Sequence, residues 1–265
     1  TLVFPHVCPE TMSGEGAYPR QIQQYQDEGF LIIRDLIGPK VIQPLIGELE
    51  QSVNDAAHEA IERGLLTQTA YPNASFPARL ALMSASCSDP DFLWSRIEGK
   101  RHKTAGMFTV RTCSALLDIV ESLIGPEILA HPQTNLRAKL PKDERGVIPW
   151  HQDLAYLVPE DAGETLIVNF WIPLVRATAK NGCMQVIRGS HRSGLLPHNL
   201  RESIFIGITE ADLPAGDIVT CELDVGDVLI TMERVLHRSI PNVSDTVRWS
   251  LDTRYSRLGL PTGRT

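Results

Sequence analysis

Long apolar runs are absent from this 265-residue sequence, and so is any excess of positive charge. A helix needs about 20 consecutive apolar residues to cross a bilayer, and no stretch meets that requirement. The formal net charge is −7, from 25 Lys and Arg against 32 Asp and Glu. Binding to nucleic acid through bulk electrostatics is not expected, since phosphates attract basic surfaces. The sequence therefore predicts no membrane partner and no nucleic-acid partner.

Cysteine is scarce, with five residues and no CxxC pair among them. An odd number without paired spacing argues against a zinc site and a disulfide framework, so we expect reduced thiols. The first residues lack the basic segment and the apolar run of a secretory signal. A hydrophobic content of 43% is that of a globular protein. We expect a cytoplasmic monomer or homodimer whose partner is a small-molecule substrate.

Helical spacing dominates the first half of the chain. Apolar residues recur at steps of three and four over 39–63, which predicts the longest helix. A short helix followed by a strand is expected over 18–37, and further helices over 89–97 and 114–123.

After Pro132 the pattern changes to short runs of strand type. Asn181-Gly182, between two of these runs, is typical of a hairpin turn because both residues tolerate positive φ. Helices followed by short strands predict an α+β fold that is mainly β, with N-terminal helices buttressing an antiparallel barrel or sandwich. We expect one domain over 1–265, helical to about 130 and built from strands over 131–257. The predicted strands cover 134–140, 148–157, 165–174, 183–187, 227–232 and 247–255.

Trp150-His151-Gln152-Asp153 is the central motif for chemistry. On a strand, residues two apart point to the same face, so His151 and Asp153 would project together. His237, 84 residues beyond Asp153, follows another predicted strand and supplies a third ligand. Two histidines and one carboxylate on one face leave three metal positions open, which suits Fe(II) that must bind a co-substrate and dioxygen together.

Arg248 lies 11 residues after His237 on a strand in which polar and apolar residues alternate. Its polar face also carries Ser250 and Asp252. A charge inside a barrel needs a partner, and a dicarboxylate supplies one because guanidinium grips carboxylate through two parallel hydrogen bonds. We expect Arg248 to anchor such a co-substrate, with Ser239 donating to the same carboxylate. The alternative is a solvent-facing arginine on an edge strand.

The sequence resembles the phytanoyl-CoA dioxygenase family of Fe(II)/2-oxoglutarate oxygenases. The stretches that carry the resemblance are Tyr25-Gln-Asp-Glu-Gly-Phe-Leu-Ile32, Pro149-Trp-His-Gln-Asp-Leu-Ala-Tyr156, Asn181-Gly-Cys-Met-Gln-Val-Ile-Arg-Gly-Ser-His191, and His237-Arg-Ser239 with Arg248. It extends from about residue 19 to 255 and is looser between 51 and 125. One departure is Arg188, where the family usually has proline before its Gly-Ser-His turn.

The resemblance implies a double-stranded β-helix, a jelly-roll or cupin-like barrel with iron at one mouth. It implies that His151, Asp153 and His237 are the catalytic metal ligands. The positions that match co-substrate contacts are Arg248, Ser239, Trp171, Gln133 and Asn135. The implied cofactors are Fe(II), 2-oxoglutarate and O2, with ascorbate as an optional reductant. The implied reaction is hydroxylation of an aliphatic C–H bond with formation of succinate and CO2.

Several alternatives stay open at this point. The same ligands serve desaturation or ring formation in secondary metabolism, whereas the carboxylate of Asp153 favours oxygenation over halogenation. An extradiol or other iron dioxygenase without 2-oxoglutarate would have no need for Arg248. A non-catalytic jelly-roll binding protein is the remaining class, since this architecture also hosts receptors.

Substrate identity is the least constrained expectation. Two basic clusters, Arg101-His102-Lys103 and Arg137-Ala-Lys139, are candidates to meet an anionic substrate, or else are solvated surface charges. The segment 71–76 is either a loop that closes over the site or an ordinary connection.

Overall fold

The computed structural model describes residues 19–67, 70–98, 103–157, 165–200 and 205–262. The first half is mostly helical, as the spacing predicts. No helix of the described ranges has both the length and the apolar character that crossing a membrane requires. The elements of this half are α1 (Pro19–Glu28), β1 (Phe30–Ile33), α2 (Pro39–Glu62), α3 (Phe76–Ser86), α4 (Pro90–Ile97), α5 (Ala105–Arg111) and α6 (Ser114–Ile124).

Helices α1, α2, α4 and α6 confirm the predicted ranges, but α3 and α5 were not expected. In α2 the apolar stripe is buried over most of its length, from Ile42 to Ala60. The unexpected helix α5 begins after Thr104, whose hydroxyl accepts a hydrogen bond from the backbone N–H of Met107. Its seven residues are too few for a clear apolar period, so the sequence carries little signal for it.

The second half consists of short antiparallel strands. The expected strands at 134–140, 165–174, 183–187, 227–232 and 247–255 are confirmed. The observed strands are β2 (Ile128–Ala130), β3 (Asn135–Lys139), β4 (Ile167–Pro173), β5 (Met184–Ile187), β6 (Asn199–Leu200), β7 (Ile206–Gly207), β8 (Ile218–Cys221), β9 (Val228–Met232), β10 (His237–Ser239) and β11 (Arg248–Arg257).

Two of the sheets build the framework of the molecule. The larger has the order β1-β9-β4-β11-β2, with β3 also paired to β11, and the smaller has the order β10-β5-β8. All pairs in both sheets are antiparallel. The mixed α+β class is as predicted. The ladders of the described residues form separate sheets rather than one closed barrel.

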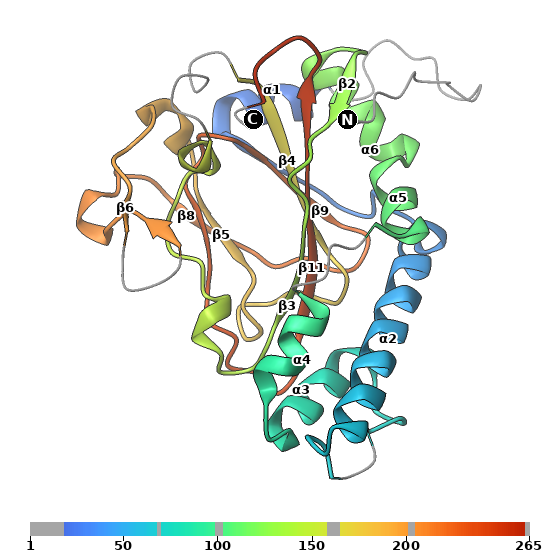
Figure 1. The fold of residues 1–265 in the computed structure, drawn as a ribbon. Coiled ribbons are helices and arrows are strands. Elements are labelled where there is room, and N and C mark those ends of the chain that lie inside the picture. Colours follow the sequence, from blue (N-terminus) through green and yellow to red (C-terminus); the bar gives the residue numbers. More distant parts are fainter. Residues whose placement is uncertain (1–18, 68–69, 99–102, 158–164, 201–204, 263–265) are drawn as a thin grey trace.

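The large sheet has two chemically different faces. Its outer face packs against the helices through residues such as Phe170, Ile230 and Trp249. In Figure 1, α2, α5 and α6 lie on that side of the large sheet, and β5 and β8 lie on the other. Its inner face meets the small sheet in a second apolar cluster that contains Trp171 and Met184. The space between the sheets is therefore enclosed on two sides.

Two local predictions are wrong. The range 148–157 is not a strand, because only His151 forms a bridge and Asp153–Tyr156 is a 3-10 helix. Pro149 has no N–H to donate to a ladder, which limits strand formation there. Asn181-Gly182 does not join a hairpin, since β4 and β5 belong to different sheets. Instead the Asn181 side chain accepts from the N–H of Thr178, and only Gly182 has positive φ.

The burial of α2 generates a stability prediction. Leu49 is fully buried in this helix and Ile61 is 42% exposed. We expect Leu49→Ala to lower the free energy of unfolding by about 2–5 kcal/mol, because it removes apolar contacts and leaves a cavity. Ile61→Ala should change it by less than about 1 kcal/mol. Chemical denaturation of both variants checks this, and equal losses would show that α2 is not docked by its apolar stripe.

Candidate metal centre

Two histidines from distant parts of the chain face each other across a backbone bridge. The N–H of His151 donates to the carbonyl of His237 at 3.1 Å, and the reverse bond has the same length. Residues directly opposite in an antiparallel pair point to the same side, so the two imidazoles lie together. Their ring centroids are 4.2 Å apart. The bridge continues the small sheet from β10 into the residues before Asp153.

Both imidazoles have Nε2 available as a ligand atom. The Nδ1 atom of His151 lies 2.8 Å from the carbonyl of Pro149, and that of His237 lies 3.0 Å from the carbonyl of Val235. Because a carbonyl only accepts, each Nδ1 carries the proton and each Nε2 presents a lone pair. Burial, together with repulsion from His237, lowers the pKa of His151 to about 3. His151 is therefore neutral, as metal binding requires, over the physiological range.

Asp153 reaches the same point from the start of the 3-10 helix. The intervening Gln152 is fully buried, and its side chain bonds to the backbone of Gly194, Leu196 and Arg234. These bonds hold the peptide between His151 and Asp153 in place. His151 and Asp153 therefore converge without the continuous strand that the sequence predicts. The His151–His237 bridge, the anchored Gln152 and the 3-10 helix bring them together.

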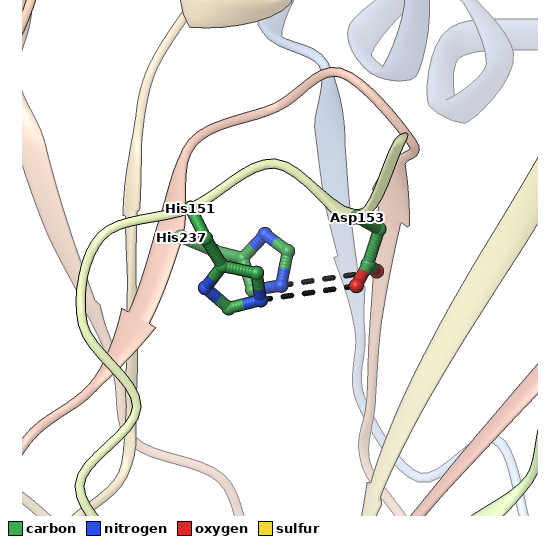
Figure 2. Close-up of side chains that lie close together, drawn as sticks. All are labelled: His151, Asp153 and His237. Atoms are coloured by element: carbon green, nitrogen blue, oxygen red, sulfur yellow. Dashed lines mark ion pairs between the residues drawn. The ribbon is translucent and has the colours of Figure 1, made fainter. Parts of the chain in front are cut away.

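Figure 2 shows the Asp153 carboxylate facing the two imidazoles. Nε2 of His151 lies 3.8 Å from Oδ1, and Nε2 of His237 lies 3.8 Å from Oδ2. Each of the three residues offers one ligand atom, and these three atoms lie within 4.8 Å of one another. All three residues are buried. The donors are two imidazole nitrogens and one carboxylate. This set and spacing suit a divalent transition metal with further positions open.

Arg254 holds the far side of the Asp153 carboxylate. Its Nη2 donates to Oδ1 at 2.6 Å, and its Nη1 donates to Oε1 of Gln133 at 2.5 Å. Within the described ranges no hydrogen bond reaches the other carboxylate oxygen, Oδ2, which is the oxygen nearer His237. Burial raises the pKa of Asp153, but attraction by Arg254 and the two histidines outweighs it, so the net pKa is lowered. The carboxylate is ionised and has one oxygen available.

A second polar group lies farther along the inner face of β11. Arg248 is buried, and its Nη1 donates to the hydroxyl of Ser250 at 2.5 Å. Its guanidinium lies over the Trp171 ring, 5.2 Å from the centroid. Burial lowers the pKa of Arg248 to about 10, so it keeps its charge at neutral pH. The predicted polar face of this strand is confirmed, and the solvent-facing alternative for Arg248 is wrong.

Lys139 connects Arg248 to Ser239. It is the cross-strand partner of Arg248 in the pairing of β3 with β11. Its Nζ donates to the Ser239 hydroxyl at 2.8 Å and to the carbonyl of Ile240. Ser239 lies two residues beyond His237, on the same face of β10. The strand therefore links this polar group to the bridge that carries the two histidines.

Buried polar atoms without protein partners recur on the inner face. They include Nε of Arg248, Oδ1 of Asp252 and both amide atoms of Asn169, which pairs in register with Arg254. Buried polar groups are normally hydrogen-bonded, so such atoms on one face indicate a polar ligand between the sheets. His151, Asp153 and His237 at one end fit a metal. Arg248 and Lys139 at the other end fit an anionic small molecule.

The predicted site residues fall into two groups. His151, Asp153 and His237 converge, with Gln133 joined to them through Arg254. The second group is Arg248, Ser239 and Trp171, which lie around the cationic group formed by Arg248 and Lys139. Asn135 begins β3, opposite Asp252, and no hydrogen bond of its side chain is among those found in the described part of the chain.

Arg254, Lys139 and Asn169 were missed as parts of the site. The two-residue period that exposed Arg248 continues to Arg254, so that signal was present. For Lys139 the sequence leaves a contact to an anionic substrate and a solvated surface charge open, and its burial against Ser239 excludes the second. Nothing local in the sequence distinguishes Asn169 within an apolar strand.

The remaining candidate segments contribute little to this centre. Arg101 and His102 lie outside the described residues, and Lys103 is exposed. Phe76, at the end of the 71–76 segment, stacks on Trp249 with centroids 4.9 Å apart. Trp249 belongs to the outer face of the sheet, so this contact favours an ordinary connection over a loop that covers the site.

Comparisons with known proteins point to one family. The sequence model of the phytanoyl-CoA dioxygenase (PhyH) family matches residues 25–250. A 1-deoxypentalenic acid 11-beta-hydroxylase of Streptomyces arenae is 30% identical over 152 residues, which is 52% of each chain. The chain thus spans about half the length of that hydroxylase. The peroxisomal phytanoyl-CoA dioxygenase of Rattus norvegicus is 23% identical over 260 residues, covering 94% of this chain and 72% of the rat protein.

The fold also has a solved counterpart. The epimerase SnoN from nogalamycin biosynthesis, in complex with Fe3+, alpha-ketoglutarate and nogalamycin RO, has a TM-score of 0.58 and 18% identity. The similarity covers 92% of this chain and 86% of that one. At this identity the likeness is one of fold.

The pairing of Asp153 with Arg254 generates a prediction on stability. Their side chains are 10% and 8% exposed. Replacing Arg254 with Met should lower the free energy of unfolding of the metal-free protein by about 3–5 kcal/mol, because a buried carboxylate loses its cation. The double variant Arg254→Met/Asp153→Asn should regain most of this loss. Denaturation of the single and double variants checks the coupling, and additive losses would contradict it.

Proposed function

This chain belongs to the phytanoyl-CoA dioxygenase family, and on that premise we propose that it is an Fe(II)- and 2-oxoglutarate-dependent dioxygenase that hydroxylates an aliphatic C–H bond of a small organic molecule. The convergence of His151, Asp153 and His237 within 4.8 Å carries the proposal. We assign the two facing sheets to a double-stranded β-helix, with the helices of the first half as its buttress.

The three converging residues would hold the iron. Nε2 of His151, Nε2 of His237 and Oδ2 of Asp153 are the available atoms, since hydrogen bonds already engage the other polar atom of each side chain. Two nitrogens and one oxygen on one side leave the opposite positions for ligands from solution. Arg254 would keep the carboxylate ionised and hold its orientation.

Arg248 and Ser239 would bind the distal carboxylate of 2-oxoglutarate. Ser239 is two residues along β10 from His237, a distance of roughly 7 Å in extended backbone. A five-carbon diacid has about this reach when its keto-acid end lies at the metal. The Trp171 ring beneath Arg248 would form one wall of the site. Gln133 and Asn135 stay predicted contacts of the co-substrate.

The bound iron and 2-oxoglutarate would supply the oxidising chemistry, in which O2 is consumed, 2-oxoglutarate becomes succinate and CO2, and a C–H bond becomes C–OH. The protein residues bind, orient and exclude water. The apolar cluster between the sheets, with Phe30, Trp171 and Leu229, closes one side of the site. Asn169 offers a buried amide that has no partner among the described residues, which suits a substrate or co-substrate that bears a hydroxyl or carbonyl group.

The cationic group also separates this proposal from its alternatives. An iron dioxygenase that does not use 2-oxoglutarate has no requirement for Arg248 beside the metal ligands, and a binding protein has none for an open metal site. Desaturation and ring closure would use the same residues. Product analysis by mass spectrometry distinguishes them, since hydroxylation adds one oxygen atom to the substrate whereas desaturation removes two hydrogen atoms.

The metal assignment predicts a loss of both iron and turnover. Asp153→Ala and His237→Ala should each abolish stoichiometric Fe(II) binding and substrate-independent 2-oxoglutarate decarboxylation, because two ligands hold the ion weakly. Iron content after anaerobic reconstitution and succinate release are the measurements. His58→Ala, which removes an exposed histidine of α2, is the control and should retain both. Full succinate formation by Asp153→Ala would refute the ligand assignment.

The anchor assignment predicts a change in co-substrate affinity. Arg248→Ala should raise the apparent KM for 2-oxoglutarate by about 10- to 100-fold, because a buried charge-assisted pair is lost. The Michaelis constant for the organic substrate should change little. The matched control is Arg257→Ala, which removes an exposed arginine from the same strand. An unchanged KM in the Arg248 variant would remove the reason to assign 2-oxoglutarate to this pocket.

A further inference from the structure

Lys139 is a buried lysine that has no ion-pair partner in the described part of the chain. It is 2% exposed, and among the described residues no carboxylate lies within ion-pair distance of its Nζ. Two of the three donors of an ammonium group are used, by Ser239 and the carbonyl of Ile240. One donor remains, in a place that water does not reach freely.

Arg248, opposite Lys139 in the pairing of β3 with β11, is buried in the same way. The described part of the chain offers it no carboxylate within ion-pair distance either, and its Nε has no partner at all. Arg248 and Lys139 are register partners on β11 and β3, where directly opposite side chains lie close together. Charging both buried groups at once is unfavourable unless an anion lies beside them, and unpaired lysine and arginine are rarely buried. The pair therefore points to an anionic ligand that contacts both.

We infer that Lys139 is a second cationic contact for the distal carboxylate of the co-substrate, acting beside Arg248 and Ser239. The inference rests on the proposed function, because it takes that carboxylate to belong to 2-oxoglutarate. A carboxylate offers about four lone-pair sites, enough for a guanidinium and an ammonium, and for the Ser239 hydroxyl when it turns from the carbonyl of Gly146, to which it donates at 3.2 Å. The Ser239 hydroxyl, which contacts Lys139 directly, fixes the ammonium on the side of the pocket that leads to His237.

The charge of Lys139 then depends on the ligand. The groups that face it are Arg248 from β11, Glu144 from the segment after β3, and Cys183 before β5. Burial, followed by repulsion from Arg248, lowers the pKa of Lys139 to about 6 in the protein alone. A bound carboxylate favours the ammonium form and raises that pKa. Above pH 6, ligand binding should accordingly take up a proton, and affinity should fall as pH rises toward the pKa of the bound state.

The first test separates the distal carboxylate from the rest of the ligand. Calorimetric titrations under anaerobic conditions use the Mn(II)-loaded protein with 2-oxoglutarate, or with 2-oxovalerate, which keeps the keto acid but lacks the distal carboxylate. Lys139→Met should weaken 2-oxoglutarate binding by at least about tenfold, since a desolvated charge pair is lost. It should leave 2-oxovalerate binding within about twofold of the wild type. Lys40→Met, at an exposed lysine, is the control.

Each outcome has a distinct meaning. If Lys139→Met weakens both ligands equally, Lys139 is a structural residue and the inference is overturned. It is overturned as well if neither ligand is affected. If the wild-type protein with Mn(II) binds no 2-oxoglutarate, the proposed function itself fails.

The second test needs no variant. Titrations of wild-type protein with 2-oxoglutarate at pH 8, in buffers with different ionisation enthalpies, should reveal uptake approaching about one proton per ligand. Titrations with 2-oxovalerate should lack this uptake. Equal proton exchange with the two ligands would contradict the inference, even if Lys139→Met fails to fold.

Discussion

Two peptide hydrogen bonds between His151 and His237 fix the site on which everything else depends. They join segments more than 80 residues apart and oblige two imidazoles to share one side of the backbone. The Nδ1 bonds to backbone carbonyls then determine which nitrogen is free. Because the geometry is set by main chain, the imidazoles are placed before any metal arrives. Such preorganisation limits the entropy that binding must overcome.

Strand β11 adds a buried polar face to this site. Its outer residues, among them Trp249 and Tyr255, pack against the helices, and its inner residues are polar yet buried. A strand of this kind is unstable unless its inner side chains find partners. Arg254 finds one in Asp153, whereas Arg248, within the ranges that the structure describes, contacts Ser250 and the face of Trp171 but no carboxylate. The same alternation that stabilises the fold therefore buries Arg254 against a carboxylate and Arg248 beside none among the described residues.

The sequence was sufficient to predict this two-faced strand, because period-two alternation survives in any register. It also predicted the long helix α2, whose apolar stripe is unambiguous. It could not predict that Asp153 begins a helical turn, since that depends on Gln152 bonding to residues some 40 and 80 positions away. For the same reason the sequence does not decide between a substrate contact and a solvated surface charge for Lys139. Its burial follows from pairing with β11, and pairing is a tertiary property that local pattern does not contain.

The metal-ligand end and the Arg248 end of the inner face differ in charge, and that difference would set the orientation of a bound ligand. At the metal end, the carboxylate of Asp153 is paired with Arg254, and His151 is neutral. At the other end, Arg248 and Lys139 are register partners, and among the described residues neither has a carboxylate within ion-pair distance. On the proposed function, a diacid would be drawn by Coulomb attraction to Arg248 with one carboxylate, which would leave its keto-acid end toward His237. The reversed orientation would place no keto group at the metal, so Arg248, with Lys139 charged once the anion is bound, would select the productive orientation as well as contribute affinity.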